Sequence, residues 1–288
     1  MKSAVEDLEL VSAPNLSEAL RLLASQPGWE PIAGGTDLMV LLNAGKLSGQ
    51  RFVSIRQLPE LRRIVVLDDE VVLGAALTYT AIREHPVLRA EFPLLPIAAS
   101  WTGGIANQNR GTIGGNIVNA SPAADSAPPL LAYDASLRLS SLRGERIIPY
   151  REFHTGYKQM QLARDEMVTA IHLRRQFAGW THYARKVGAR KAQAISKVCL
   201  NGVMQRAGDT VTGIALALGS VAPIPIRCVG AEAELLGRSI SPRTIARAQE
   251  ALTEEIKPID DVRSTALYRS SVARNLLREF LLTAHDAG

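Results

Sequence analysis

Two short glycine-rich segments hold the residues of this chain that are best suited to binding chemistry. They read AGGTD at residues 33–37 and GTIGGN at residues 111–116. Glycine allows positive φ angles and, because it has no Cβ, lets backbone N–H groups approach a ligand closely. Successive N–H groups that point into one concavity bind phosphate oxygens. The two segments are therefore predicted to be anion-binding loops in which exposed backbone is the binding surface.

An aspartate follows the second loop. Asp125 ends the segment NASPAAD, and a carboxylate that accepts two hydrogen bonds can hold a pair of ribose or ribityl hydroxyls. Neither loop matches the G-x-G-x-x-G fingerprint or the Lys-Ser/Thr ending of a P-loop, which disfavours both of those nucleotide sites. Glycine pairs are also frequent in tight turns, so either loop taken alone would be interpreted as a turn.

The bulk composition indicates a globular protein of a reducing compartment. Of the 288 residues, 47% are hydrophobic, which is ordinary for a packed core. No apolar run reaches the ~18 residues of a membrane helix, and the N-terminus lacks the apolar segment of a signal peptide. The two cysteines, Cys199 and Cys228, are too few for a four-cysteine iron–sulfur cluster or a disulfide framework. We therefore expect a cytoplasmic protein with no membrane span.

The positive charge raises the question of nucleic-acid binding. The net charge is +5 and the isoelectric point is about 9.4. The arginines are spread along the chain and aromatic residues make up 5%, whereas nucleic-acid binders combine basic faces with interleaved aromatics. A solvated surface is favoured, and a basic patch for an acidic partner or an anionic cofactor is the alternative. The histidines are scattered, so no metal site is predicted.

The hydrophobic pattern predicts an α+β protein. Residues 15–28 have the spacing of a helix that ends at Gly28, DEMVTAIHL has that of a strand, and Arg143-Gly144 marks a hairpin. The composition changes after about residue 176. We therefore predict an N-terminal region over 1–176 and a C-terminal region over 177–288.

Two helices are predicted near the C-terminus. The first begins after the capping residue Ser241 with Pro242 in its first turn, and the last covers about 265–283. The apolar face of the first is Ile245, Ala248, Leu252 and Ile256, and that of the last is Tyr268, Val272, Leu276 and Phe280.

Six segments, in order along nearly the whole chain, resemble one protein family. They are PIAGGTDLMVLL, NRGTIGGNIVNASPAADSAPPLLAYDA, FHTGYKQMQLARDEMVTAIHL, RKVGARKAQAISKV, ALALGSVAPIPIR and PIDDVRSTALYRSSVARNLL. Together they resemble the FAD-binding, or medium, subunit of the molybdenum hydroxylases, which include the xanthine dehydrogenase and carbon monoxide dehydrogenase flavoproteins. The resemblance implies a PCMH-type FAD-binding domain of two α/β subdomains over 1–176. It also implies a CO dehydrogenase flavoprotein C-terminal-like domain, with a small antiparallel sheet and helices, over 177–288.

The resemblance further implies a noncovalent FAD site. Both glycine loops would hold the pyrophosphate, Asp125 would bind FAD hydroxyls, and Val168 would lie against the flavin. Lys186 would lie near the isoalloxazine ring, where a cation favours the anionic reduced flavin. A valine at Gly114 or Gly115 would then collide with the pyrophosphate. The implied loop residues are Ile32, Ala33, Gly34, Gly35, Thr36 and Asp37 in the first loop, and Thr112, Ile113, Gly114, Gly115 and Asn116 in the second.

Simpler roles are open for three of these residues, and one position departs from the family pattern. Val168 could be a buried strand residue, Lys186 a solvated surface lysine, and Asp37 a helix cap. Gln108 stands where an arginine is common in the family, which leaves local contacts to a partner subunit or to the flavin edge open.

The activity implied by the resemblance is electron transfer. In the family a large subunit with molybdopterin oxidises the substrate, and a small subunit with two [2Fe–2S] clusters relays electrons to the flavin, which passes them to NAD+ or another acceptor. This chain would carry only FAD and no acid or base for the organic substrate. The resemblance points to a dimer of heterotrimers and leans slightly toward purine oxidation. The alternatives are a self-sufficient FAD-dependent oxidoreductase of related fold and a non-enzymatic nucleotide or nucleic-acid binder.

Overall fold

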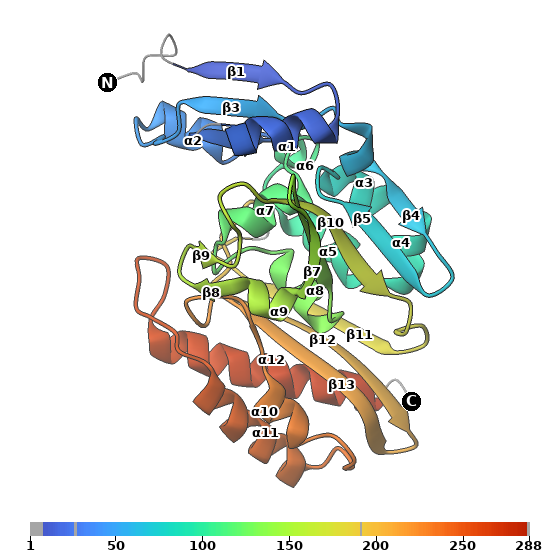
Figure 1. Cartoon of the computed structure of the whole chain (residues 1–288). Coiled ribbons are helices and arrows are strands. Elements are labelled where there is room, and N and C mark those ends of the chain that lie inside the picture. Colours follow the sequence, from blue (N-terminus) through green and yellow to red (C-terminus); the bar gives the residue numbers. More distant parts are fainter. Residues whose placement is uncertain (1–7, 26–27, 191, 287–288) are drawn as a thin grey trace.

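The computed structural model describes residues 8–25, 28–190 and 192–286. These residues form three layers, from the N-terminal layer at the top of Figure 1 to the C-terminal layer at the bottom. Each layer is built around a β-sheet of its own, and helices accompany every sheet. The α+β class predicted from the sequence is confirmed.

The N-terminal layer is a small parallel sheet with two helices. The sheet order is β1-β3-β2, and both strand pairs are parallel. Helix α1 buries Ala19, Leu20 and Leu23, which confirms the predicted helix within the described residues. The first glycine loop connects β2 to α2. The elements are β1 (Glu9–Ser12), α1 (Leu16–Ser25), β2 (Trp29–Ile32), α2 (Leu38–Asn43) and β3 (Arg51–Ser54).

The middle layer is a five-stranded antiparallel sheet with short helices packed against it. Its order is β4-β5-β10-β6-β7. The predicted strand and hairpin are confirmed, because β10 runs through DEMVTAIHL and Gly144 turns the chain between β6 and β7 with φ 132°. The strands are β4 (Ile64–Val66), β5 (Glu70–Gly74), β6 (Ser136–Ser141), β7 (Gly144–Pro149) and β10 (Met167–Arg174), with a hairpin of β8 (His154–Gly156) and β9 (Gln159–Met160) beside them.

The helices of the middle layer are short because glycine and proline interrupt them. They are a 3-10 turn (Pro59–Arg62), α3 (Tyr79–Glu84), α4 (Pro86–Glu91), α5 (Leu94–Trp101), α6 (Ile105–Gln108), α7 (Ile113–Asn119), α8 (Ala127–Ala132) and α9 (Tyr150–Phe153).

The C-terminal layer is an antiparallel sheet of order β11-β12-β13-β14 with three helices on it. Ser241 and Thr244 form a capping box at the start of α11, which confirms the predicted start of this helix. The elements are β11 (Thr181–Val187), β12 (Val198–Ala207), β13 (Thr210–Gly219), β14 (Ile226–Arg227), α10 (Val229–Ala233), α11 (Pro242–Glu255) and α12 (Ala266–Asp286).

The predicted apolar face of the last helix is partly wrong. Leu276 and Phe280 are buried, whereas Tyr268 is 43% exposed and Val272 is only half-buried. The buried stripe also contains Ala273, Leu277 and Leu281. Phe280 fits against Gly202 of β12, where an added Cβ would lie 2.6 Å from the ring, and this contact fixes the rotation of the helix. The start of α12 is left outside the core.

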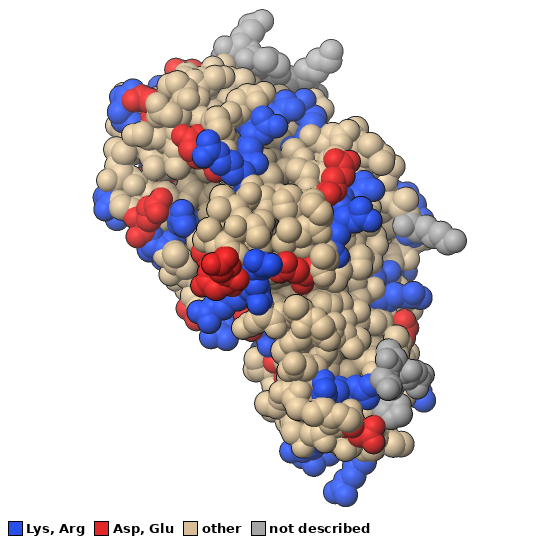
Figure 2. All heavy atoms as spheres, turned by 90° about the vertical axis from the view of Figure 1, so that its right-hand side faces the viewer, with Lys and Arg blue, Asp and Glu red and all other residues tan. Residues whose placement is uncertain are grey.

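Helix α8 joins the middle and C-terminal layers. All six of its residues are buried, and it packs on β12, β13 and β14. Arg227 of β14 strengthens the junction, because its Nη1 donates to Asp134 Oδ1 at 2.6 Å and to the carbonyl oxygen of Leu131 at 3.2 Å. Lys and Arg are interspersed with Asp and Glu on the face shown in Figure 2 and do not gather into one basic patch there. Within the described ranges, no helix is long and apolar enough to cross a membrane.

Candidate functional site

A large cleft lies between the N-terminal and middle layers. Its volume is about 940 Å³, within the range of small-molecule and cofactor sites. The first glycine loop, the start of α7 and the chain from β9 to β10 form its walls. The sequence-predicted residues that line it are Ala33, Gly34, Gly35, Thr36, Asp37, Thr112, Gly114, Gly115, Asn116 and Val168.

The first glycine loop offers unused hydrogen-bond donors to this cleft. Among the described residues, no acceptor is present for the backbone N–H groups of Gly34, Gly35, Thr36 and Asp37. Gly35 has φ +72°, a left-handed conformation that favours glycine. Four successive donors next to a cavity form the kind of concavity that binds phosphate oxygens. The first loop therefore has the geometry expected from its sequence.

Gly34 holds the two loop segments together. An added Cβ at this position would lie 2.0 Å from the carbonyl oxygen of Arg110. The Arg110 side chain also reaches back, because its Nε donates to the carbonyl oxygen of Gly34 at 3.4 Å. Glycine is required here for close approach of two backbones, one from each loop.

The second glycine segment has a different construction from the one expected. It is the first turn of α7, and its N–H groups from residue 113 on are already used: Ile113 donates to Leu77, Gly114 to Ala75, and Gly115 to the Thr112 hydroxyl, at 3.0, 2.9 and 3.2 Å. The prediction that exposed N–H groups form the binding surface is thus wrong for these residues. A glycine-rich sequence is compatible both with a helix start that faces a cavity and with a free loop, so the sequence could not distinguish the two structures.

The prediction that a valine at Gly114 would collide with the pyrophosphate is also wrong. An added Cβ at Gly114 would lie 2.7 Å from the Cβ and the carbonyl oxygen of Ala75. The collision is therefore with the end of the central sheet. At Gly115 an added Cβ would meet only the Thr112 hydroxyl, at 2.9 Å.

Asp125 and Lys186 bind each other behind the cleft and do not line it. Lys186 Nζ lies 2.7 Å from Asp125 Oδ2, and both side chains are 10% exposed. Lys186 also donates to the carbonyl oxygen of Trp101 at 3.2 Å. The alternative of a solvated surface lysine is therefore wrong for Lys186. Ile32 and Ile113 do not line the cleft either.

Burial leaves Asp125 with spare binding capacity. Its Oδ1 atom is buried and has no hydrogen-bond partner in the described part of the chain. Desolvation raises the pKa of Asp125 to about 6, although the Lys186 ammonium acts to lower it. An acceptor in this state gains most from a hydroxyl donor supplied by a ligand.

The structure decides whether Val168 is a buried strand residue and whether Asp37 is a helix cap. Val168 is buried on β10 and lines the cleft, so it is both a core residue and part of the wall. Asp37 stands before α2 without a side-chain cap hydrogen bond, which makes the helix-cap role wrong. Its Oδ1 accepts from Asn119 Nδ2 at 3.4 Å across the cleft mouth.

Gln108 supports one edge of the cleft. It is 3% exposed. Its Nε2 donates to the carbonyl oxygen of Ser100 at 3.0 Å and its Oε1 accepts from Arg83 Nη1 at 2.6 Å. These bonds hold the turn at residues 102–103, and that turn lines the cleft. The departure from the family pattern at this position is therefore accommodated by a buried polar network.

The cleft has further lining residues that the sequence did not single out. Lys158, with φ +57°, donates from Nζ to Asn119 Oδ1 at 2.7 Å. Arg164 adds a second cation, and Met160 and Leu162 add apolar wall beside Val168. No motif marks these residues, because the β8–β9 hairpin and the chain that follows it bring them to the cleft from outside both loops.

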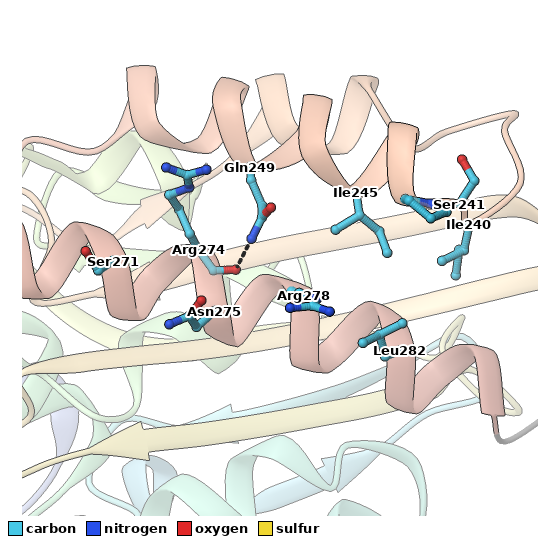
Figure 3. A pocket seen from close by; sticks show the side chains of 10 residues that line it. Ile240, Ser241, Ile245, Gln249, Ser271, Arg274, Asn275, Arg278 and Leu282 are labelled. Carbon is cyan, nitrogen blue, oxygen red and sulfur yellow. Dashed lines mark hydrogen bonds between the residues drawn. The ribbon is translucent and has the colours of Figure 1, made fainter.

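A second hollow has none of these features. It lies between α11 and α12, has a volume of about 790 Å³, and is drawn in Figure 3. The Gln249 side chain reaches across it to the carbonyl oxygen of Arg274 at 2.8 Å. None of the sequence-predicted site residues lines it, so the cleft beside the first loop is the candidate site.

The cleft combines the groups that a flavin dinucleotide needs. Unpaired N–H groups suit a pyrophosphate and the apolar wall at Val168 suits an aromatic ring, while the unpartnered Asp125 oxygen lies buried behind the cleft. Within the described residues, no group of His, Cys, Asp and Glu side chains is arranged to hold a metal ion.

Comparison with known proteins agrees with this construction. Residues 6–174 match the family described as "FAD binding domain in molybdopterin dehydrogenase", and residues 183–284 match "CO dehydrogenase flavoprotein C-terminal domain". The xanthine dehydrogenase FAD-binding subunit of Escherichia coli O157:H7 is 32% identical over 276 residues, which are 94% of each chain. The carbon monoxide dehydrogenase medium chain of Hydrogenophaga pseudoflava is 29% identical over 253 residues, 88% of each chain.

A solved structure shows the same fold over nearly the whole length. A chain of the Hydrogenophaga pseudoflava carbon monoxide dehydrogenase superimposes with a TM-score of 0.92, covering 97% of both chains at 29% identity. The family match extends over more than half of this chain and includes the cleft. The chain therefore belongs to the FAD-binding subunit family of the molybdopterin dehydrogenases, the flavoproteins of the molybdenum hydroxylases.

Proposed function

We propose that this chain binds FAD noncovalently in the cleft and serves as the electron-transfer subunit of a molybdopterin-dependent dehydrogenase. The observation that carries the site is the row of unpaired N–H groups at residues 34–37. These donors would hold the pyrophosphate, with Lys158 and Arg164 adding positive charge. No histidine or cysteine is among the described residues that line the cleft, which supports a noncovalent complex.

The remaining residues would orient the cofactor. Val168 offers an apolar contact to the ring system. Asp125, which lies behind the cleft, would accept a hydrogen bond on its unpartnered Oδ1 from a hydroxyl of the sugar or ribityl part that reaches it. Asn116 and the first turn of α7 supply the opposite wall by shape. Bound FAD supplies the redox chemistry, and the protein supplies position and electrostatics. Lys186, neutralised by Asp125, contributes a fixed dipole behind the cleft.

The electrons would come from partner subunits. Relatives are named as medium chains or FAD-binding subunits, which supports a complex with a large molybdopterin subunit and a small subunit with [2Fe–2S] clusters. We propose a dimer of such heterotrimers, NAD+ or another acceptor as the oxidant, and a cytoplasmic location that suits the two free, buried cysteines. The division into domains at about residue 176 is part of the same proposal.

The organic substrate is proposed with a slight lean toward purines. The xanthine dehydrogenase relative is 32% identical, and a 6-hydroxypseudooxynicotine dehydrogenase subunit of Paenarthrobacter nicotinovorans is 31% identical. A difference of one percentage point in identity supports only a slight preference. In addition, the substrate would bind to another chain.

Purification of the tagged chain from its native host tests the proposal. The expected result is a yellow protein whose FAD is released by acid precipitation and which carries molybdenum- and iron-containing partners. Xanthine and aldehydes would then be screened as reductants of the flavin. A flavin that stays in the precipitate contradicts the noncovalent complex. FAD without partners favours the self-sufficient oxidoreductase, and a colourless protein contradicts the proposed cofactor site.

A further inference from the structure

A buried tyrosine in the cleft wall has a hydroxyl group that the protein itself does not use. Tyr79 is 3% exposed and lines the cleft, and its hydroxyl has no hydrogen-bond partner in the described part of the chain. Buried polar groups in folded proteins are nearly always paired, so each exception needs a physical reason. The cofactor site offers one, because a ligand in the cleft would supply the partner.

Backbone contacts fix Tyr79 to the second glycine segment. It is the first residue of α3, and Thr78 caps this helix by accepting from the N–H of Ala81 at 3.2 Å. The N–H of Tyr79 donates to the carbonyl oxygen of Gly111 at 3.3 Å. An added Cβ at Gly111 would lie 3.3 Å from Cε2 of the tyrosine ring. The ring therefore packs on a glycine and has little freedom to turn away.

This position is next to the loop that is proposed to hold the pyrophosphate. The Cα of Gly111 lies 3.0 Å from the point that an added Cβ of Gly34 would occupy, and Gly34 is the first of the four residues with unpaired N–H groups. In FAD the pyrophosphate is flanked by the ribityl chain on one side and by the ribose on the other, and both carry hydroxyl groups. Tyr79 therefore lies where a hydroxyl-bearing part of the cofactor is expected.

The surroundings of Tyr79 keep its hydroxyl protonated. Burial raises the pKa of the phenol, the Ser126 hydroxyl acts to lower it, and the Asp125 carboxylate raises it further. Ser126 Oγ donates to Asn116 Oδ1 at 2.6 Å and does not meet the Tyr79 hydroxyl in hydrogen-bond geometry. The phenol thus retains a proton to donate, and the matching ligand atom must be an acceptor.

Asp125 offers the complementary function in the same region. Its charge acts on the Tyr79 hydroxyl, and its buried Oδ1 also lacks a partner in the described part of the chain. A hydroxyl group donates one hydrogen bond and accepts others. A ligand hydroxyl that reaches both side chains would therefore accept from Tyr79 and donate to Asp125, which pairs two buried groups at once.

We propose that Tyr79 is a positioning residue of the cofactor site, whose hydroxyl donates to a hydroxyl oxygen of the ribityl or ribose part beside the FAD pyrophosphate. The inference rests on the proposed function, since it needs FAD in the cleft. The buried hydroxyl is unpaired in the cofactor-free protein and becomes paired when FAD binds. Its removal therefore weakens FAD binding without weakening the fold, because an unpaired buried polar group contributes nothing favourable to stability.

Two tyrosine-to-phenylalanine variants test the proposal in the full-length chain. Tyr79→Phe removes the hydroxyl in the cleft wall and keeps the ring. Tyr150→Phe is the matched control, because Tyr150 is 2% exposed, its hydroxyl also lacks a partner in the described residues, and it does not line the cleft. Quenching of flavin fluorescence measures FAD binding to the apoprotein, urea unfolding measures its stability, and FMN and ADP are titrated in competition with FAD.

Tyr79→Phe is expected to bind FAD about tenfold more weakly than the wild type, as for the loss of one hydrogen bond. The urea midpoint of its apoprotein should stay the same or rise. Tyr150→Phe should bind FAD within about twofold of the wild type. Unchanged FAD affinity in Tyr79→Phe, or an equal loss in Tyr150→Phe, overturns the proposal. A lower urea midpoint together with the loss of affinity indicates a structural role and overturns it as well.

The competition experiment identifies the part of the cofactor that Tyr79 contacts. FMN contains the ribityl chain and ADP contains the ribose, so a loss of affinity for FMN alone or for ADP alone supports the proposal and assigns the hydroxyl. An equal loss for both places the contact on a phosphate, and a loss for neither removes the contact; either result overturns the proposal. A wild type that does not bind FAD refutes the proposed function itself.

Discussion

A methyl group added at Gly34 would separate the two walls of the cofactor cleft. The Cβ of Gly34→Ala would lie 2.0 Å from the carbonyl oxygen of Arg110, roughly 1.4 Å short of an ordinary van der Waals contact of 3.4 Å. The atoms that this Cβ would meet all belong to the backbone of Arg110 and Gly111, so no side chain can rotate away to relieve the overlap. The first loop must move, and its unpaired N–H groups at residues 34–37 must move with it.

The size of the effect follows from the donors that are displaced. A hydrogen bond to a charged group contributes about 1.5–3 kcal/mol, so misplacing two of the four donors would cost about 3–6 kcal/mol, or about 10²–10⁴-fold in Kd for FAD. The free energy of unfolding should fall by less, about 1–3 kcal/mol, as for other overpacked sites. The loss of binding is therefore expected to exceed the loss of stability.

Titration of apoprotein with FAD, followed by quenching of flavin fluorescence, measures Kd, and urea unfolding measures stability. Gly115→Ala is the comparison within the same cleft. Its added Cβ meets only the Thr112 hydroxyl, and the N–H of Gly115 is already bonded within the protein. It should weaken FAD binding less than tenfold. Wild-type affinity in Gly34→Ala, or an equal loss in Gly115→Ala at equal stability, would refute the assignment of the pyrophosphate to the first loop.

Three further substitutions test other parts of the structure. Burial raises the pKa of Asp125 to about 6, so the folded state binds the carboxyl proton more tightly than the unfolded state does. The stability that the protonated carboxyl contributes is therefore fully present below about pH 4 and is lost as the pH rises through 6. Asp125→Asn should remove up to about 3 kcal/mol of that pH dependence. The free energy of unfolding is measured with urea between pH 4 and 7, and an equal dependence on pH in the variant and the wild type would contradict this. Gln108→Leu leaves the guanidinium of Arg83 and a carbonyl oxygen without their partner and should lower the free energy of unfolding by about 2–4 kcal/mol. An unchanged urea midpoint would show that this network is dispensable. Ser241→Ala breaks the capping box of α11 and should cost about 1–2 kcal/mol, seen as a fall of about 2–4 °C in Tm, with Ser241→Asp as the capping control that should restore most of the loss.

Local sequence patterns predicted the elements that local interactions determine. Ser241 and Pro242 mark the start of α11 because a cap and a first-turn proline act within a few residues. Gly144 marks the β6–β7 hairpin because it directly follows the two-residue turn with a positive φ of 132°, which favours glycine. The face of α12 was harder, since Phe280 is placed by Gly202 of a distant strand. Helical spacing alone could not show that Tyr268 lies beyond the end of the core.

In the candidate site, too, local sequence does not predict contacts between segments that are distant in the chain. Gly34 and Gly114 have similar sequence surroundings, yet one adjoins unpaired N–H groups and the other donates to Ala75 within a helix start. Asp125 and Lys186 lie in different layers, so neither spacing nor composition predicts that they form an ion pair. Most of the residues named by the resemblance line the cleft, whereas Ile32, Ile113, Asp125 and Lys186 do not, and only the structure shows what each group contacts.

The location of the cleft explains what each part of the chain contributes. Every described residue that lines it lies between Gly28 and Val168, so the C-terminal layer adds nothing to the wall that would hold FAD. That layer instead supplies Lys186, which binds Asp125 behind the cleft, and Gln193, which packs on the turn at its edge. The first two layers therefore form the whole described wall of the cleft, and the third layer supports that wall from behind through the Lys186–Asp125 ion pair.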